Sequence, residues 1–163
     1  MGFKKVNKEL LETNIKLEKM KIEDIPQIAK IYISYWGSMC LYSDKQFEMI
    51  ISQNISYVYK YQNEIIAFCL VKCDYMSGII NIDTLCVKEE YKGHHLGQNI
   101  LSFSLQNCME LGFRDFSLHV STTNIPALNL YKKLGFVIKD FIKKYYIDVK
   151  TEDSDAYYME LNL

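Results

Sequence analysis

One stretch of the sequence combines an apolar strand, a charged turn and the beginning of a helix. It runs from Leu85 to Gly97, and its two glycines are Gly93 and Gly97. The first N–H groups of a helix have no partner within the helix and lie at the positive end of its dipole. Glycine lets a phosphate come close to them. The stretch therefore predicts an anion site, although a surface turn before an ordinary amphipathic helix has the same pattern.

The turn resembles the acyl-CoA loop of the GNAT superfamily of N-acetyltransferases. The pattern of that loop is Arg or Gln, two residues, Gly, one residue, and then Gly or Ala. In this sequence Lys92 keeps the charge of the first position and Gly97 matches the last, but His95 stands where the family has Gly. The resemblance implies that this stretch binds acetyl-CoA. The residues it assigns to the cofactor are Leu85, Cys86, Val87, Lys92, Gly93, His94, His95, Leu96, Gly97 and Gln98.

Size and composition are those of one ordinary globular domain. The chain has 163 residues, of which 49% are hydrophobic and 24% charged, so neither disorder nor a fibrous class is indicated. The formal net charge is -1. Because there is no basic excess, we do not expect a nucleic acid as partner.

The cysteines and the apolar runs suggest a soluble cytoplasmic protein. Five scattered cysteines form no pair of C-x-x-C motifs, so they read as small core residues of a reduced compartment. The longest apolar run, Ile65 to Val71, is far shorter than a membrane span, and the first residues carry no signal peptide or myristoylation motif. No metal is expected, because the adjacent His94 and His95 cannot easily face one ion.

Hydrophobic periodicity divides the chain into strands and helices. Residues 15–20 alternate as a half-buried strand, whereas Asp24 and Pro26 begin a helix with a capping carboxylate and a proline in its first turn. The expected strands are 15–20, 56–61, 65–73, 79–87, 116–120, 136–149 and 156–161. Helices are expected from 24, from 43 or 44, from 97 to a cap at Gly112, and from a cap at 122–124 to Gly135.

This element order predicts an α+β fold with a mixed sheet. We expect a single domain over 1–163, with about seven strands flanked by four helices and a frayed arm at 1–14. Residues 62–64 should turn a hairpin, and the acidic residues 151–154 should join the last two strands. The order of elements is also that of the GNAT fold.

The second half of the chain resembles the catalytic subunits of protein N-alpha-acetyltransferases. The similarity covers roughly residues 80–163 and is greatest to the NatE (San) type, followed by the NatA type. Before the hairpin, only residues 42–45 match the NatE type. The matching positions are 117–120, Asn124, Ala127, 131–136, 144–146 and 155–159.

The reaction of such enzymes is attack of an uncharged amine on a thioester carbonyl. It needs a base for the ammonium, polarisation of the carbonyl and a proton for the departing thiolate. Since an α-amine has a pKa near ~7.7 to 8, a base tuned close to neutrality suffices. His119 projects from a strand end and is of the right type, although a single histidine among apolar residues is commonly a core residue.

The resemblance assigns catalytic roles to three positions. It makes His119 a base that acts through water, paired in the NatE type with a tyrosine at the position that is Asn81 here. Asn81 can orient a water but cannot take a proton. Tyr131 stands where the superfamily places the general acid for the thiolate, and the alternative is an ordinary stripe residue of its helix. Asn124 and Ala127 match positions beside the CoA arm, and a plain helix cap is the alternative for Asn124.

For substrate binding the resemblance points to four residues near the cleft mouth, namely Tyr42, Asp83, Tyr145 and Tyr146. Phenol hydroxyls can hydrogen-bond a peptide backbone without reading its side chains. Cross-strand aromatic packing is the other interpretation of the last two tyrosines.

The expected function is transfer of acetyl from acetyl-CoA to the α-amine of a protein or peptide N-terminus, with an auxiliary subunit as a possible partner. One alternative is acetylation of a lysine side chain or a small amine. Another is an acyl-CoA-binding subunit with impaired catalysis, which the departures at Asn81 and His95 leave open.

Overall fold

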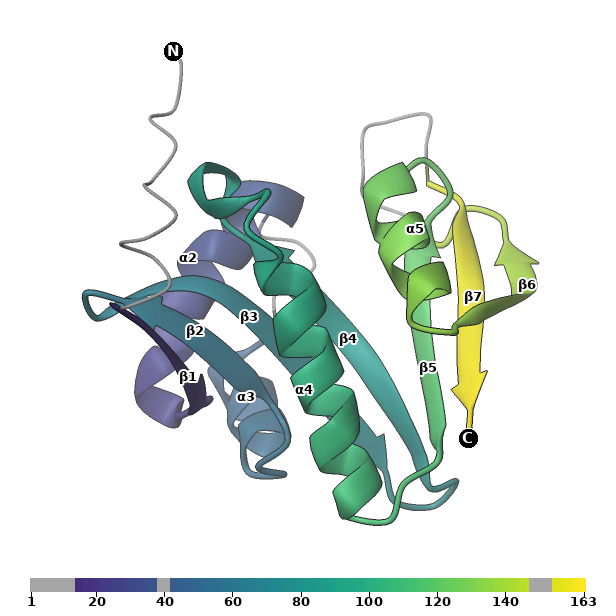
Figure 1. Cartoon of the computed structure of the whole chain (residues 1–163), viewed down its shortest axis with the longest axis horizontal. Coiled ribbons are helices and arrows are strands. Elements are labelled where there is room, and N and C mark those ends of the chain that lie inside the picture. Colours follow the sequence, from purple (N-terminus) through teal and green to yellow (C-terminus); the bar gives the residue numbers. More distant parts are fainter. Residues whose placement is uncertain (1–13, 38–41, 147–153) are drawn as a thin grey trace.

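The computed structural model describes residues 14–37, 42–146 and 154–163. Its seven strands form one sheet in the order β1-β2-β3-β4-β5-β7-β6 (Figure 1). Only β4 and β5 are parallel neighbours. The strands are β1 Ile15–Lys19, β2 Tyr57–Tyr61, β3 Glu64–Asp74, β4 Ile79–Val87, β5 Asp115–Ser121, β6 Val137–Ile142 and β7 Ala156–Asn162. The helices are α2 Ile25–Trp36, α3 Asp44–Ile51, α4 Leu96–Glu110 and α5 Ile125–Lys133, with 3-10 turns η1 Ile22–Asp24 and η2 Glu89–Tyr91.

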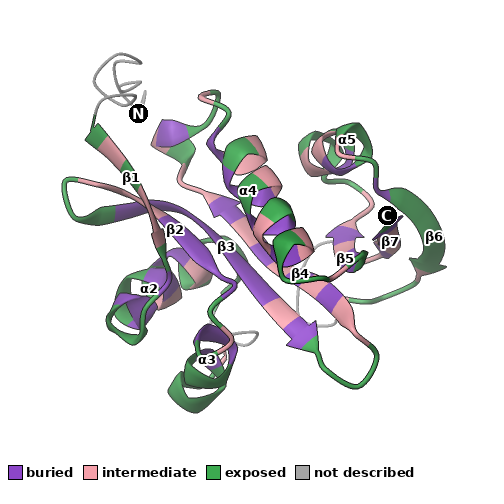
Figure 2. Ribbon diagram, turned by 60° about the horizontal axis from the view of Figure 1, so that its bottom comes forward, coloured by how far each residue is buried: buried purple, intermediate pink, exposed green. Residues whose placement is uncertain are grey.

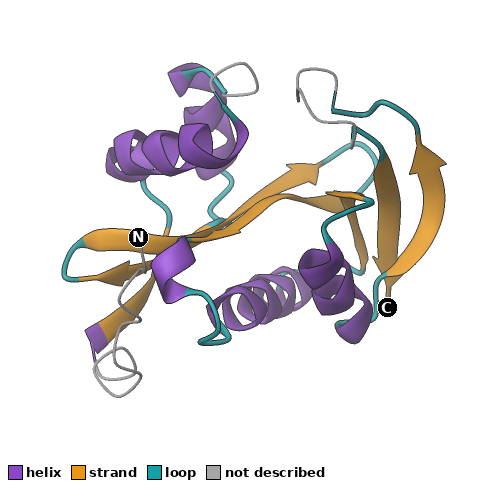
Figure 3. Cartoon of the chain, turned by 90° about the horizontal axis from the view of Figure 1, so that it is seen from above, coloured by secondary structure: helices purple, strands orange, loops and turns teal. Residues whose placement is uncertain are grey.

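These elements confirm the predicted α+β class, the mixed sheet of seven strands and the four helices. Helices α2 and α3 cover one face of the sheet, and α4 and α5 cover the other (Figure 3). Over β5 and β7, the face on the side of α2 and α3 carries none of the described helices. None of the described helices is long and apolar enough to cross a bilayer. The arm expected at 1–14 lies outside the described residues except for Asn14.

The core consists of two layers of apolar side chains, one on each face of the sheet. Phe47 of α3 and Phe68 of β3 belong to the layer under α2 and α3. Ile100 and Leu101 of α4 belong to the other, together with Tyr131 of α5. Strand β3 is buried over most of its length (Figure 2), as expected for a strand covered on both faces.

The helix caps follow the predictions with one exception. Ser43 caps α3 and Asn124 caps α5, each accepting a hydrogen bond from an N–H in the first turn. Asp24 precedes α2 but does not cap it. Its carboxylate instead accepts from the backbone N–H of Lys21 (2.9 Å) and pairs with Lys60 (2.8 Å). A buried carboxylate is stabilised by such a partner, and the ammonium of Lys60 supplies the opposite charge.

The strand predicted for 136–149 is wrong in its length, because β6 ends at Ile142. Pairing with β7 stops there, where Ile142 lies opposite Ala156. Lys144 then takes a positive φ of 54°, which an extended strand does not allow, and its N–H donates to Asp155 (2.8 Å). Residues 151–153 of the predicted acidic turn lie outside the described residues.

Strands β4 and β5 pair over only four residues, from Ile79 to Ile82 on β4. Beyond that point both strands continue but diverge (Figure 1). The β3–β4 register shifts at the same point, because Leu70 lies opposite Thr84 and Val71 opposite Ile82. Asp83 is therefore the extra residue of a β-bulge. A bulge re-aims side chains and ends pairing, so it opens a gap in the middle of the sheet.

Candidate active site

The loop before α4 presents a row of free amides. The N–H of Asn99 donates to the carbonyl of His95 (2.9 Å), and it is the first to do so within the helix. No acceptor in the described part of the chain binds the backbone N–H groups of residues 93–98. The six consecutive donors lie at the positive end of the α4 dipole, which is the arrangement that binds phosphate. The loop therefore has the backbone geometry that the predicted anion site requires.

The backbone of this loop explains the glycine pattern. His95 has φ 59° and ψ 12°, the left-handed conformation that glycine adopts at little cost. Gly93 also has a positive φ, of 84°. At Gly97 an added Cβ would lie 3.4 Å from the Val87 side chain, an ordinary contact. The last position therefore tolerates alanine, whereas the position of His95 favours glycine.

The side chains around the loop hold it in place. The Lys92 ammonium pairs with Glu89 and lies 5.4 Å from the centre of the Tyr35 ring. On the other side, the Gln98 side chain accepts a hydrogen bond from Lys133 (3.0 Å), which ties the beginning of α4 to α5. His94 and His95 have no third metal-binding neighbour among the described residues.

The bulge also decides which β4 residues face α4. Leu85 packs against the α4 core, and Val87 contacts a small cluster with Leu96. Cys86 points into the opposite core, where burial raises the pKa of its thiol to about 12. Cys86 lies opposite Phe68, so its backbone groups face β3 rather than the gap. Because β5 no longer pairs with this part of β4, the other edge of β4 is open to an extended ligand, although its Val87 carbonyl accepts from the Tyr35 hydroxyl (3.1 Å).

Helix α5 places two of the predicted residues beside the same gap. Asn124 caps the helix, accepting from the N–H of Ala127 (3.2 Å). Tyr131 is buried in the α4 core and contacts Phe136 edge to face. Burial, and then the neighbouring Cys69 thiol and Tyr146 phenol, raise the pKa of Tyr131 above its ordinary value. Its hydroxyl therefore stays protonated at neutral pH and can serve as an acid.

On the opposite face of the sheet, His119 lies between two tyrosine rings. Tyr145 stacks on the imidazole, with ring centres 4.4 Å apart and planes 9° apart, and Tyr158 lies at 5.1 Å. Burial, followed by the positive charge of Lys72, lowers the pKa of His119 below 6.5. Since no described residue hydrogen-bonds the ring, the neutral imidazole is free to accept a proton.

Asn81 lies on the same face as His119, one strand away. Its side-chain amide donates to the Ser117 hydroxyl (3.2 Å), two residues before His119 on β5. Beyond Ser117, the Tyr158 hydroxyl donates to Glu160 (3.0 Å). The amide of Asn81 thus belongs to a polar row across the sheet, and no described contact joins it to His119.

Tyr42 and Asp83 meet at the bulge, together with a residue that the sequence did not reveal. The Tyr42 hydroxyl donates to the Asp83 carboxylate (2.6 Å) and accepts from the Lys72 ammonium (2.7 Å), which also pairs with Asp83. Lys72 lies opposite Asn81 on β3. Period-two alternation on β3 would place Lys72 on this face, but only the bulge explains why it meets Asp83.

The last two predicted tyrosines complete this face. Tyr145 and Tyr146 contact each other edge to face at 4.9 Å. Burial raises the pKa of Tyr146 to about 12, with smaller effects from Tyr145 and from Tyr32 of α2. Aromatic packing therefore accounts for part of this arrangement. Tyr145 packs on Tyr146 and on the imidazole of His119.

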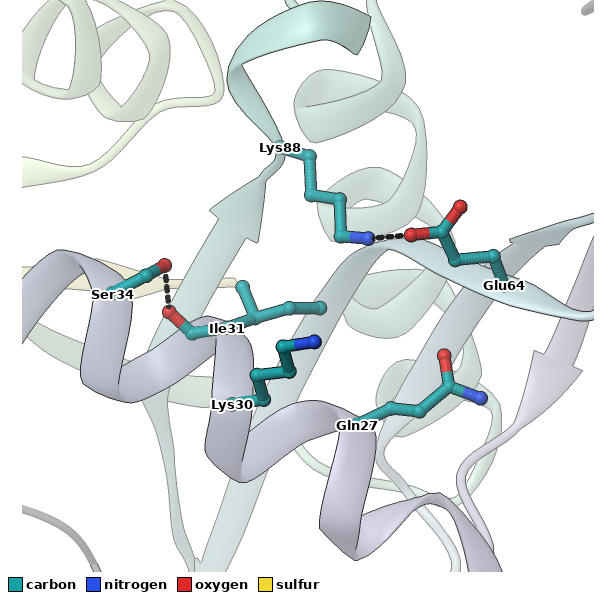
Figure 4. Close-up of a pocket in the computed structure, with 6 residues that line it drawn as sticks. All are labelled: Gln27, Lys30, Ile31, Ser34, Glu64 and Lys88. Atoms are coloured by element: carbon teal, nitrogen blue, oxygen red, sulfur yellow. Dashed lines mark hydrogen bonds and ion pairs between the residues drawn. The ribbon is translucent and has the colours of Figure 1, made fainter.

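The structure thus gathers the predicted residues on two sides of one gap. The loop before α4 and Tyr131 lie on one side, and Tyr42, Asp83, His119, Tyr145 and Tyr146 lie on the other. A separate hollow between α2 and the ends of β3 and β4 contains none of them (Figure 4). Its lining residues are Gln27, Lys30, Ile31, Ser34, Glu64 and Lys88.

Comparison with known proteins identifies the family of the chain. The sequence model of the acetyltransferase (GNAT) family matches residues 23–136. A putative [ribosomal protein bS18]-alanine N-acetyltransferase of Bacillus subtilis (strain 168) is 27% identical over 153 residues, which cover 93% of this chain and 99% of that protein. An N-alpha-acetyltransferase of Sulfurisphaera tokodaii is 34% identical over 80 residues, which cover 48% of this chain and 46% of that protein.

Solved structures agree with this match. Arabidopsis thaliana Naa50, in complex with the bisubstrate analogue CoA-Ac-MVNAL, superimposes with a TM-score of 0.80 and 25% identity, over 92% of this chain and 99% of that one. The NatC complex bound to Gag peptide and CoA gives the same TM-score at 20% identity, over 92% of this chain and 99% of that one, which shows a shared fold. The chain therefore belongs to the acetyltransferase (GNAT) family and is an acetyl-CoA-dependent N-acetyltransferase.

Proposed function

We propose that this enzyme transfers acetyl from acetyl-CoA to the α-amine of a protein or peptide N-terminus. The observation that carries the proposal is the face around His119, where the rings of Tyr145 and Tyr158 flank the imidazole and the nearby carboxylate of Asp83 is already paired. Such a face offers hydrogen bonds to a peptide backbone. Among the described residues of this face, the carboxylates of Asp83 and Glu160 are both hydrogen-bonded, which leaves neither free for a polyamine.

Acetyl-CoA supplies the acetyl thioester, and its diphosphate fits the free amides of residues 93–98. Its extended arm fits along the unpaired edge of β4. Tyr131 and the first turn of α5, which Asn124 caps, lie beside the path of this arm. The thioester carbonyl would then reach the point where β4 and β5 part.

His119 takes the proton of the substrate ammonium, directly or through a water. Its lowered pKa keeps it neutral at pH 7, so it is ready to accept that proton. Asn81 and Ser117 can orient a water beside it, because their hydrogen-bonded side chains lie on the same face. Tyr131 donates its phenolic proton to the departing thiolate, for which its raised pKa keeps it protonated.

The peptide is held by the aromatic side chains of this face. The hydroxyls of Tyr145 and Tyr146 can bind backbone groups near the amine. Tyr42 has a different role. Its hydroxyl is bound by Asp83 and Lys72, and its ring contacts Phe47 edge to face. It therefore shapes the wall of the site more than it offers a free hydroxyl.

The relatives support this substrate class. The Bacillus subtilis protein is named for the alanine of a ribosomal protein, and the Arabidopsis protein was solved with a CoA-linked peptide. A ribosomal protein is therefore one concrete form of the proposed substrate. Because the NatC structure is that of a complex, an auxiliary subunit is a further partner to be sought by co-purification.

The proposal is tested with three acceptors offered separately, together with acetyl-CoA. They are peptides with a free N-terminus, the same peptides with a blocked N-terminus and an internal lysine, and a small diamine. Acetylation of the first set, at least tenfold faster than of the other two, supports the proposal. Preference for lysine or the diamine would overturn it. Binding of acetyl-CoA without turnover would favour an impaired acyl-CoA-binding subunit.

A further inference from the structure

Lys72 lies at the wall of the face around His119, where the proposed function places the peptide. Its ammonium pairs with Asp83 and donates to the Tyr42 hydroxyl at 2.7 Å. It also lies 5.1 Å from the centre of the Tyr42 ring. An ammonium has three N–H donors, so its two partners among the described residues leave one donor for a ligand.

Asp83, in contrast, has little capacity left for a substrate. One carboxylate oxygen binds Lys72 and Tyr42, and the other accepts from the Thr84 hydroxyl (3.0 Å). The side chain of Asp83 is 13% exposed, whereas that of Lys72 is 34% exposed. Of the two charges, the positive one is therefore the more open to an incoming peptide.

The positive charge of Lys72 also acts on the imidazole of His119. After burial, Lys72 is the charge that lowers the pKa of His119, and it opposes Asp83 at Tyr145. In the described part of the chain, the other carboxylate on this face is Glu160, which is bound by the Tyr158 hydroxyl one row away. A positive charge beside the base favours substrates with a negative charge near the amine and opposes a second cation there.

We propose that Lys72 determines the charge specificity of the enzyme, selecting peptides with a carboxylate in the first two residues over peptides with a cation there. This inference rests on the proposed function. It names a substrate preference that the tyrosines of the site do not give, because phenols do not distinguish charge. The repulsive part acts against basic peptides, and the attractive part uses the remaining N–H of Lys72.

The test compares kcat/KM for matched peptides with Glu, Gln or Lys at position one, and again at position two. With the wild type, the Glu peptide of at least one series should exceed the Gln peptide about tenfold, which corresponds to about 1.4 kcal/mol, and the Lys peptide should be the poorest. Equal rates for the three peptides in both series would overturn the inference and leave the proposed function intact. Failure to acetylate any peptide would instead overturn the proposed function.

Variants separate charge from packing. Lys72→Met leaves the Asp83 charge unbalanced, so the preference should reverse toward the Lys peptide. Lys72→Met combined with Asp83→Asn removes both charges and should show no preference between the Glu and Lys peptides. Lys72→Arg keeps the positive charge and should keep the wild-type preference for the Glu peptide. Lys88→Met is the matched control, since Lys88 is also a partly buried, ion-paired lysine but lies at the far end of β4. An unchanged preference in Lys72→Met contradicts the inference.

Salt provides a measurement that needs no variant. If Lys72 selects through its charge, the ratio of the Glu to the Lys peptide should fall as ionic strength rises from about 0.01 to 1 M, where the Debye length shrinks from about 30 to 3 Å. A ratio that does not depend on salt would show that shape, and not this charge, sets the preference.

Discussion

Single residues in this enzyme depart from their family pattern in ways that the structure explains. His95 occupies a left-handed position that the family fills with Gly, and its φ of 59° is strained for any residue with a Cβ. Burial raises the pKa of Tyr131, so its phenol keeps its proton, and burial followed by the charge of Lys72 lowers the pKa of His119, which favours the neutral imidazole. Each of these properties makes a prediction that one substitution can test.

Replacing His95 by Gly should stabilise the protein. Release of left-handed strain is worth about 1 kcal/mol, partly offset by the greater freedom of Gly in the unfolded chain. The melting temperature should rise by up to about 2–4 °C, and acetyl-CoA should bind more tightly because glycine lets the phosphate come closer to the loop amides. Gly93→Ala provides the opposite control, since Gly93 also has a positive φ and should lose stability. A lower melting temperature for His95→Gly would contradict this account of the loop.

Replacing Tyr131 by Phe removes the proton and keeps the ring packed against Phe136. If the phenol is the general acid, kcat should fall by roughly 100-fold or more. The dissociation constant of acetyl-CoA, measured by calorimetry, should change little. An unchanged kcat would make Tyr131 only a core residue of its helix.

At the scale of elements, β3 and β5 together set the protonation of the base. Burial, and then the charge of Lys72 on β3, disfavour the imidazolium of His119 on β5, so the pKa of His119 lies below 6.5. Above about pH 6.5 the pH dependence of kcat/KM should therefore follow the peptide amine, with its pKa near ~7.7 to 8. Removing Lys72 removes a nearby cation, so the pKa of His119 should rise and the lower limb of the profile should move to higher pH in Lys72→Met.

The base itself is tested by His119→Ala. This variant should lower kcat by roughly 100-fold and should lose the lower limb of the profile. A variant that keeps near-full activity, or a Lys72→Met profile identical to that of the wild type, would show that the base lies elsewhere. Circular dichroism checks that both variants are folded.

Much of this arrangement of elements could be predicted from local signals in the sequence. Capping residues such as Ser43 and Asn124, and alternation in the strands, depend on neighbours in the chain. The bulge at Asp83 could not be predicted, because it arises from the pairing of β3 with β4. The ion pair with Lys72, and the early end of β6 at Ile142, depend on the same kind of long-range pairing.

At the scale of the whole molecule, one gap in a sheet joins two binding surfaces. The loop before α4 and helix α5 lie on one side of it (Figure 3). The tyrosines around His119 lie on the other side. The loop departs from the GNAT pattern at His95, but the order of elements along the chain supports the family. The ion pair of Lys72 with Asp83, on the other side of the gap, has no such signal in the sequence.

Acetyl-CoA should stabilise the folded molecule as a whole. A ligand at about 100 times its dissociation constant contributes about 2.7 kcal/mol, which corresponds to a rise in melting temperature of about 5–10 °C for a chain of this size. Differential scanning fluorimetry with and without acetyl-CoA measures this rise. No shift at saturating concentrations would contradict the cofactor site at residues 93–98.

Transfer of the acetyl group to an α-amine can be tested within a single peptide. A peptide with both a free N-terminus and an internal lysine is incubated with the enzyme and acetyl-CoA, and tandem mass spectrometry locates the added acetyl group. The account predicts acetylation of the α-amine, because the lower pKa of that amine and the tyrosine-lined face around His119 both favour it. Acetylation of the lysine side chain, with the α-amine of the same peptide left free, would contradict it.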